Sequence, residues 1–95
     1  MKIADIKLGL SAITVEAKVV EIGEPRDVNT KYGVKSVADA ILEDETGQIK
    51  LSLWEGQIES VAIGDTVVVH GAYVTQFRNT LQLSIPKSGK LEKLD

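Results

Sequence analysis

The amino-acid sequence predicts an all-β domain, a five-stranded barrel with one short helix between strands three and four. Apolar and polar residues alternate with a period of two through most of the chain, which is typical of strands with one buried face. Helical periodicity is confined to residues 55–63. The 95 residues fit one domain, and we expect residues 1–95 to form it.

The first half of the chain carries the signals for two long strands. Residues 13–19 alternate without a break and the phase changes at Val20, which predicts a β-bulge in the first strand. Residues 23–33 interrupt the pattern and are predicted to be a loop. A second strand, ambiguous in its facing, is predicted over about residues 34–43, before a hairpin turn at residues 44–47.

The third strand, residues 48–54, has the clearest facing. Its apolar residues point to one side, and the other side carries Lys50, Ser52 and Trp54. After the helix, a fourth strand is predicted over residues 66–74, and Gly71 within it is a candidate position for a bulge. A loop follows over residues 76–79. The fifth strand covers residues 80–85 and ends at Pro86. Three strands, a helix and two more strands are the order of the OB fold.

Composition limits the functions that the chain can have. It has no cysteine, which excludes disulfides and cysteine-ligated metal sites. No apolar run approaches the roughly 18 residues that span a bilayer, and no signal peptide is visible. We therefore expect a protein without a membrane partner, cytoplasmic in a prokaryote or nuclear in a eukaryote.

The net charge of −3 argues mildly against a nucleic-acid partner, but the charge is unevenly distributed. Residues 36–59 carry a net −5, whereas residues 26–35 and residues 78–95 each carry +2. Because the local field matters more to a phosphate backbone than the sum over the chain, the basic segments keep a nucleic-acid partner open.

The aromatic residues Tyr32, Trp54 and Phe77 are predicted to lie outside the core, which the aliphatic residues can fill, and the facing of Tyr73 is left open because the run of valines at residues 67–69 obscures the alternation. Rings on strand faces and in loops, with cations beside them, suit a single-stranded nucleic acid: each base that stacks contributes about 1–3 kcal/mol, and cations neutralise phosphates. A structural role, in which a ring closes the barrel end or packs on its own loop, is the alternative for each. The candidate nucleic-acid-binding residues are Tyr32, Trp54, Tyr73 and Phe77, with Lys31, Lys35, Lys50, Arg78 and Lys87.

Several segments resemble one known family over nearly the whole chain. Residues 3–10, IADIKLGL, are similar to its lead-in, and residues 44–54, DETGQIKLSLW, are similar to its most specific motif. The chain thus resembles the small single-stranded-DNA-binding proteins of archaea and eukaryotes, related to the OB folds of replication protein A. The resemblance implies that Trp54, Tyr73 and Phe77 stack bases and that DNA is preferred to RNA. Relatives often have another aromatic residue where this chain has Ser84, which implies a weaker or shorter footprint.

No pattern of catalytic residues accompanies this motif. His70 is the only histidine, and no spacing supplies it with partners. The acidic residues 43–45 are explained by a turn and a solvated face, so we expect no enzyme, no metal and no cofactor.

The leading hypothesis is a binder of single-stranded DNA with little sequence preference, acting in replication, repair or recombination. An OB-fold protein-interaction or assembly module is the main alternative, because acidic residues around Trp54 would repel phosphate. An RNA-binding OB domain is a third hypothesis. Protein partners and the oligomeric state are left open.

Overall fold

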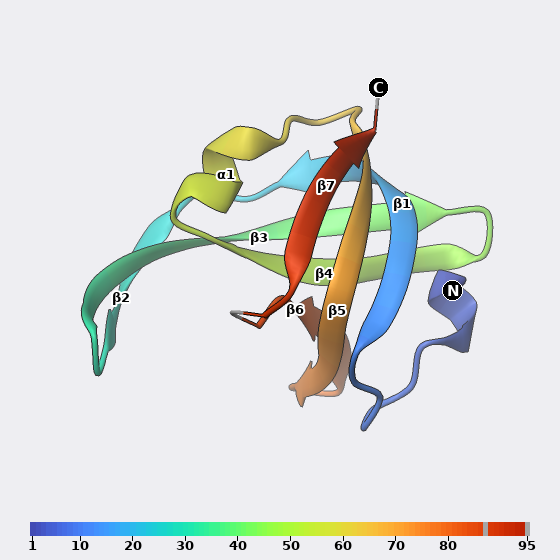
Figure 1. Ribbon diagram of the computed structural model, residues 1–95, viewed down its shortest axis with the longest axis horizontal. Helices are drawn as coiled ribbons and strands as arrows, with labels where there is room; N and C mark the ends of the chain where they lie inside the picture. The colour runs from blue at the N-terminus through green and yellow to red at the C-terminus, as the bar shows by residue number, and fades with distance from the viewer. Residues whose placement is uncertain (87, 95) are drawn as a thin grey trace.

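The structure is a computed structural model that describes every residue except Lys87 and Asp95, together with every side chain within the strands and helices except that of Phe77. Strands make up most of the described chain, as the period-two alternation predicts (Figure 1). The elements in chain order are η1 (Ile3–Asp5), β1 (Ile13–Ile22), β2 (Arg26–Thr30), β3 (Gly33–Asp44), β4 (Gly47–Trp54), α1 (Gly56–Ser60), β5 (Thr66–Phe77), β6 (Thr80–Ser84) and β7 (Lys90–Leu94).

Five of these strands form a closed ring in the order β1–β3–β4–β6–β5, because β5 pairs back with β1. The β4–β6 pairing is parallel and the others are antiparallel. β2 is added to the ring by pairing with β3, and β7 by pairing with β5. The ring with α1 between β4 and β5 confirms the predicted OB fold.

β1 closes the ring because it changes partners along its length. Its first half, from Ile13 to Lys18, pairs with β5, and its second half, from Lys18 to Ile22, pairs with β3. The register on β3 shifts between Val19 and Glu21, which is the predicted bulge. A second register shift lies where β1 meets β5 near Gly71, whose φ of +70° suits a glycine.

The buried core inside the ring is aliphatic throughout the described residues. Alternate residues of β1, from Ile13 to Val19, are buried, and so are the inward residues of the other ring strands. The largest fully buried side chains are Leu42, Leu51, Leu53, Leu83, Val15, Val19, Val67 and Val69. As the sequence indicated, Tyr32 and Trp54 stay outside this core, and so does Tyr73.

Residues 26–30 contradict the prediction of a long loop, because they form β2 in a hairpin with β3 (Figure 1). Their composition gives little strand signal, since Val28 is the only apolar residue among them. Backbone pairing with the longer β3 supplies the order instead. Thr30 closes the turn by donating its hydroxyl to the carbonyl of Gly33, 2.7 Å away.

The other corrections concern element ends. β5 continues to Phe77 instead of giving way to a loop at Gln76, because the β5–β6 turn needs only Arg78 and Asn79. Both have positive φ, +52° and +66°, as a two-residue primed hairpin turn requires. β7 and η1 were not predicted, and α1 is shorter than residues 55–63. No helix among the described residues is long and apolar enough to cross a membrane.

Candidate nucleic-acid interface

The strand register places the polar sides of β3, β4, β6 and β5 on one continuous surface, which we call the outer face. Its rows are set by the pairs Val37–Trp54, Asp39–Ser52 and Ile41–Lys50 between β3 and β4. Lys50 then pairs with Gln82 on β6, which in turn pairs with Thr75 on β5. Because side chains alternate along each strand, the outer face comprises Val37, Asp39, Ile41, Lys50, Ser52, Trp54, Tyr73, Thr75, Gln82 and Ser84, of which Val37 and Ser52 are buried by their neighbours.

Two of the predicted stacking residues lie on this face. Trp54 is half-buried at the end of β4, where its backbone N–H donates to Oε1 of Gln57 at 3.1 Å. Tyr73 lies on β5 opposite Ser84 and is 40% exposed, which settles the facing that the sequence left uncertain. Phe77 pairs with Thr80 at the end of β5, but its side chain lies outside the described part of the structure.

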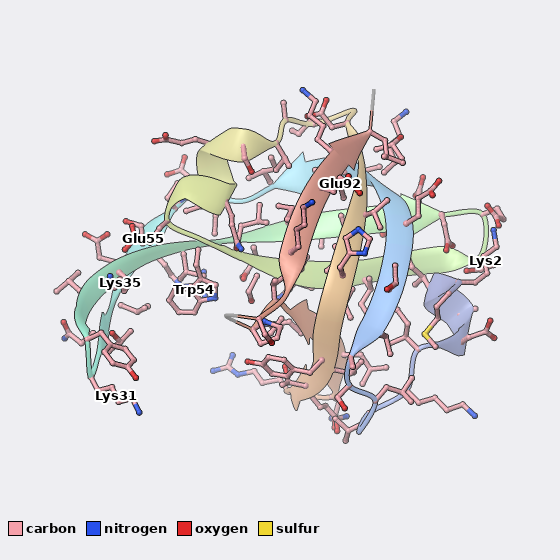
Figure 2. The ribbon with its side chains drawn as sticks, viewed as in Figure 1. Lys2, Lys31, Lys35, Trp54, Glu55 and Glu92 are labelled. Atoms are coloured by element: carbon pink, nitrogen blue, oxygen red, sulfur yellow. The ribbon has the colours of Figure 1, made fainter. Side chains whose placement is uncertain are left out.

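Cations and carboxylates alternate around the base of the β2–β3 hairpin, next to Trp54. Lys35 Nζ is 3.9 Å from Glu55 Oε1. Asp39 Oδ2 is 3.4 Å from Nη1 of Arg26 and 4.0 Å from Nζ of Lys50. Figure 2 shows Lys35, Glu55 and Trp54 together at this end of the molecule. Three cations thus surround two carboxylates, so the acidic residues near Trp54 are each paired with a base.

Arg26 was missed as a site residue because its segment was assigned to a loop. It pairs with Val37, the residue that also pairs with Trp54, and so extends the outer face onto β2. The local sequence carries little strand signal here, and it is the pairing of β2 with β3 that gives Arg26 its place.

The structure does not bring Lys31 and Tyr32 to Trp54. They form the tip of the β2–β3 hairpin, which extends away from the ring, and Figure 2 shows Lys31 at that tip. Tyr32 is 78% exposed, and Nζ of Lys31 lies 5.2 Å from the centre of its ring. Any contact of these two residues with a bound strand would therefore be made by the hairpin arm.

The opposite end of the outer face carries a hollow of about 420 Å³. Ile41, Leu81 and Asn79 line it together with Lys50. Arg78 occupies the adjoining β5–β6 turn, in the left-handed conformation. Lys87, the remaining predicted phosphate contact, lies outside the described residues.

The acidic segment at residues 43–45 builds the β3–β4 turn. Oδ1 of Asp44 accepts hydrogen bonds from the backbone and hydroxyl of Thr46 and from the N–H of Gly47, and Oδ2 accepts from the N–H of Ile3 at 2.8 Å. These bonds, the one from the Thr46 hydroxyl first, lower the pKa of Asp44 from 3.8 to about 2. The motif DETG is thereby explained as a structural turn that also holds η1.

The other titratable candidates have local partners. Lys2 pairs with Glu45, which lowers the pKa of Glu45 and raises that of Lys2. Nε2 of His70 is 3.2 Å from Oε1 of Glu92 on β7. Within the described residues, no three His, Cys, Asp or Glu side chains gather as metal ligands would.

Comparison with known proteins identifies the family. Residues 6–93 match the family described as single-stranded DNA binding protein Ssb-like, OB fold. The chain belongs to the Ssb-like OB-fold family. This confirms the resemblance given by the lead-in and the DETG motif, and it places the chain among binding proteins, not enzymes.

Two relatives of this Ssb-like chain come from archaea. It is 33% identical over 90 residues to the single-stranded DNA binding protein Ssb of Saccharolobus solfataricus, an alignment that covers 95% of this chain and 61% of that protein. It is 36% identical over 98 residues to replication factor A of Methanothermobacter thermautotrophicus, covering 96% of this chain and 12% of that protein. It therefore spans about three fifths of the first relative's length and much less of the second's.

Solved structures give the same result for the fold. The second OB-fold domain of replication protein A from Methanococcus maripaludis superimposes with a TM-score of 0.80 at 27% identity, covering 100% of this chain and 94% of that one. The Ssb-like chain therefore shares the fold of a domain that forms part of a larger replication protein.

Proposed function

We propose that this Ssb-like chain binds single-stranded DNA along its outer face and acts in DNA replication, repair or recombination. The observation that carries the proposal is the placing of Trp54 and Tyr73 on one face of the ring, with Arg26 and Lys35 near Trp54 and Lys50 further along the same face beside Asp39. Membership of the Ssb-like family and the names of its relatives support the same ligand.

The proposed mode of binding follows from the chemistry of the outer face. Bases stack on Trp54 and Tyr73, and on Phe77 as the family resemblance implies. Every base has a π-face, so stacking tolerates any sequence and contributes about 1–3 kcal/mol per base. Phosphates contact the cations around these rings.

Trp54 provides the direct test, because it is the only tryptophan and lies on the outer face. We expect oligo-dT to quench its fluorescence more strongly at 50 mM than at 200 mM salt, and the matching duplex to have little effect. Quenching by oligo-U at equal affinity would make RNA an equal ligand. No change on adding oligo-dT, with no anisotropy change of a labelled strand at micromolar protein, would contradict the proposal.

A protein-interaction module is the second candidate, and one observation favours it. Glu55 follows Trp54 directly, and Asp39 lies on the outer face. Acidic residues at these positions repel phosphate and so favour a protein partner. Their pairing with Lys35, Lys50 and Arg26 reduces the repulsion of phosphate, which is why we place DNA first. Failure of the titration above would make this candidate the leading one.

A further inference from the structure

Asp39 lies on the β3 side of the outer face, next to Trp54. On β3 it is the next outward residue after Val37, the partner of Trp54, so it is diagonal to Trp54 across the β3–β4 pair. Its own partner is Ser52. The parallel β4–β6 register carries this row onward to Ser84, which pairs with Tyr73. Tyr73 is thus three strands away from Asp39, and it is a base stacked on Trp54 that would have an edge close to this carboxylate.

The contacts of Asp39 leave one of its oxygens available. Nη1 of Arg26 and Nζ of Lys50 both approach Oδ2, at 3.4 and 4.0 Å. No side chain or backbone group in the described part of the chain donates a hydrogen bond to Oδ1. The side chain is 30% exposed, so a ligand on the outer face can reach it.

A carboxylate at this position repels phosphate and selects among bases. An ionised carboxylate only accepts hydrogen bonds. Cytosine presents the N4 amine as a donor and adenine the N6 amine, whereas thymine presents the O4 acceptor at the equivalent position. Because the carboxylate repels phosphate, the backbone phosphates would contact Arg26 and Lys50 on either side of it. The edge of a base would then lie over Asp39.

We propose that Asp39 makes the outer face base-selective by accepting a hydrogen bond from the exocyclic amine of one base, so that cytosine is preferred to thymine there. This inference rests on the proposed function and changes it from binding without sequence preference to binding with one selective position. Arg26 and Lys50 are positioning residues for the carboxylate, because both hold the same oxygen and leave the other toward the base.

The test compares labelled oligo-dC and oligo-dT, because the two pyrimidines stack with similar areas. By anisotropy at fixed salt, we expect the wild-type protein to bind oligo-dC roughly tenfold more tightly, within the discrimination of one good base contact. In Asp39→Asn the amide both donates and accepts, so the ratio should fall close to one. Oligo-dT should bind this variant more tightly than wild type, because a negative charge is removed.

Glu55→Gln is the matched control. Like Asp39→Asn, it removes one carboxylate that lies near a lysine. Nζ of Lys35 is 3.9 Å from Oε1 of Glu55, and Nζ of Lys50 is 4.0 Å from Oδ2 of Asp39. Its effect is expected to be electrostatic, so both strands should gain affinity by the same factor and the ratio should stay at the wild-type value. Equal gains for both strands in Asp39→Asn as well would overturn the inference and leave Asp39 a role in charge alone.

A measurement on the wild-type protein avoids any dependence on the folding of a variant. An oligo-dT strand with one central dC should bind nearly as tightly as oligo-dC, because a single selective position is satisfied by one cytosine. Binding as weak as that of oligo-dT would overturn the inference while leaving the proposed function intact. Absence of binding to every strand would overturn the proposed function itself.

Discussion

Trp54 is the residue on which the proposed interface most depends, because it ends β4 at the point where the hairpin cations converge. We expect Trp54→Ala to weaken binding of labelled oligo-dT by about 1–3 kcal/mol, the contribution of one stacked base. Anisotropy measures the affinity, and circular dichroism checks the fold. Tyr32→Ala is the control, since Tyr32 lies at the hairpin tip and is 78% exposed. Equal losses in the two variants would mean that the outer face is not the site.

The hydrogen bonds to Asp44 give the fold a dependence on pH at one residue. Its pKa falls to about 2 in the folded chain, so its hydrogen bonds stabilise the fold fully above the ordinary value of 3.8, and this contribution is lost as the pH falls toward 2. We expect Asp44→Asn to lower the free energy of unfolding at pH 7 and the difference from wild type to shrink below pH 4. Urea denaturation at pH 7, 4 and 2.5 measures this. Asp5→Asn, at an exposed side chain, should show no such trend.

At the scale of elements, the entry into β7 depends on a close approach of backbones at Gly89. A Cβ on Gly89 would lie 2.8 Å from the carbonyl oxygen of His70 and 2.9 Å from Cγ2 of Ile85. Gly89→Ala should therefore destabilise the fold by about 1–3 kcal/mol, the usual range for overpacking. Urea denaturation gives the value.

The matched substitution at Gly56, the first residue of α1, tests whether space is the cause. A Cβ on Gly56 meets nothing within 4 Å. Gly56→Ala should leave stability unchanged or raise it by up to about 1 kcal/mol, because alanine favours the helix and restricts the unfolded chain. A loss as large as that of Gly89→Ala would contradict the steric explanation.

The same scale shows which elements could be predicted from the sequence. β1 with its bulge, the β3–β4 turn and the facing of β4 follow from local alternation and turn chemistry, and the structure confirms them. β2 and β7 could not be predicted, because each is a short, polar strand ordered by pairing with a longer one. The connection at residues 76–79 was predicted, but its form as a two-residue turn at Arg78 and Asn79 was not, because the segment contains no glycine although both turn residues have positive φ.

The site was predictable to the same extent as its strands. Trp54 and Lys50 could be placed on one face because the alternation of β4 is unbroken. Tyr73 could not, because the bulge at Gly71 shifts the phase of β5. Asp39 and Arg26 were missed for a different reason, because their ion pair joins β3 to β2. The facing of β3 was ambiguous in the sequence, and the residues of β2 were assigned to a loop. Pairing between strands is information that the local sequence does not carry.

At the scale of the whole molecule, the net charge of −3 hides a local concentration of cations. With about four phosphates neutralised by Arg26, Lys35, Lys50 and Arg78, a single-strand slope of about −0.7 per phosphate predicts roughly 50-fold weaker binding at 200 mM than at 50 mM salt. Affinity for oligo-dT measured across this range gives the slope. A flat response would show that these cations do not contact phosphates.

Two lysine variants separate a local contact from the effect of net charge. Lys50→Ala should make the slope shallower by about 0.7, the value for one lost phosphate contact. Lys18→Ala makes the same change in net charge on β1, away from the outer face, and should leave the slope unchanged. Equal changes in the two slopes would mean that the whole-chain field governs binding.

The aliphatic core divides the chain into two sets of residues that mutation can change separately. Leucine, valine, isoleucine and alanine inside the ring determine whether the chain folds. Tyr32, Trp54 and Tyr73 lie outside that set, together with the paired cations and carboxylates. A lineage can therefore exchange rings and charges on the outer face, and so adjust ligand preference, while the buried residues that maintain the fold stay the same. For a domain that recurs in longer proteins, this separation lets one scaffold acquire several binding preferences.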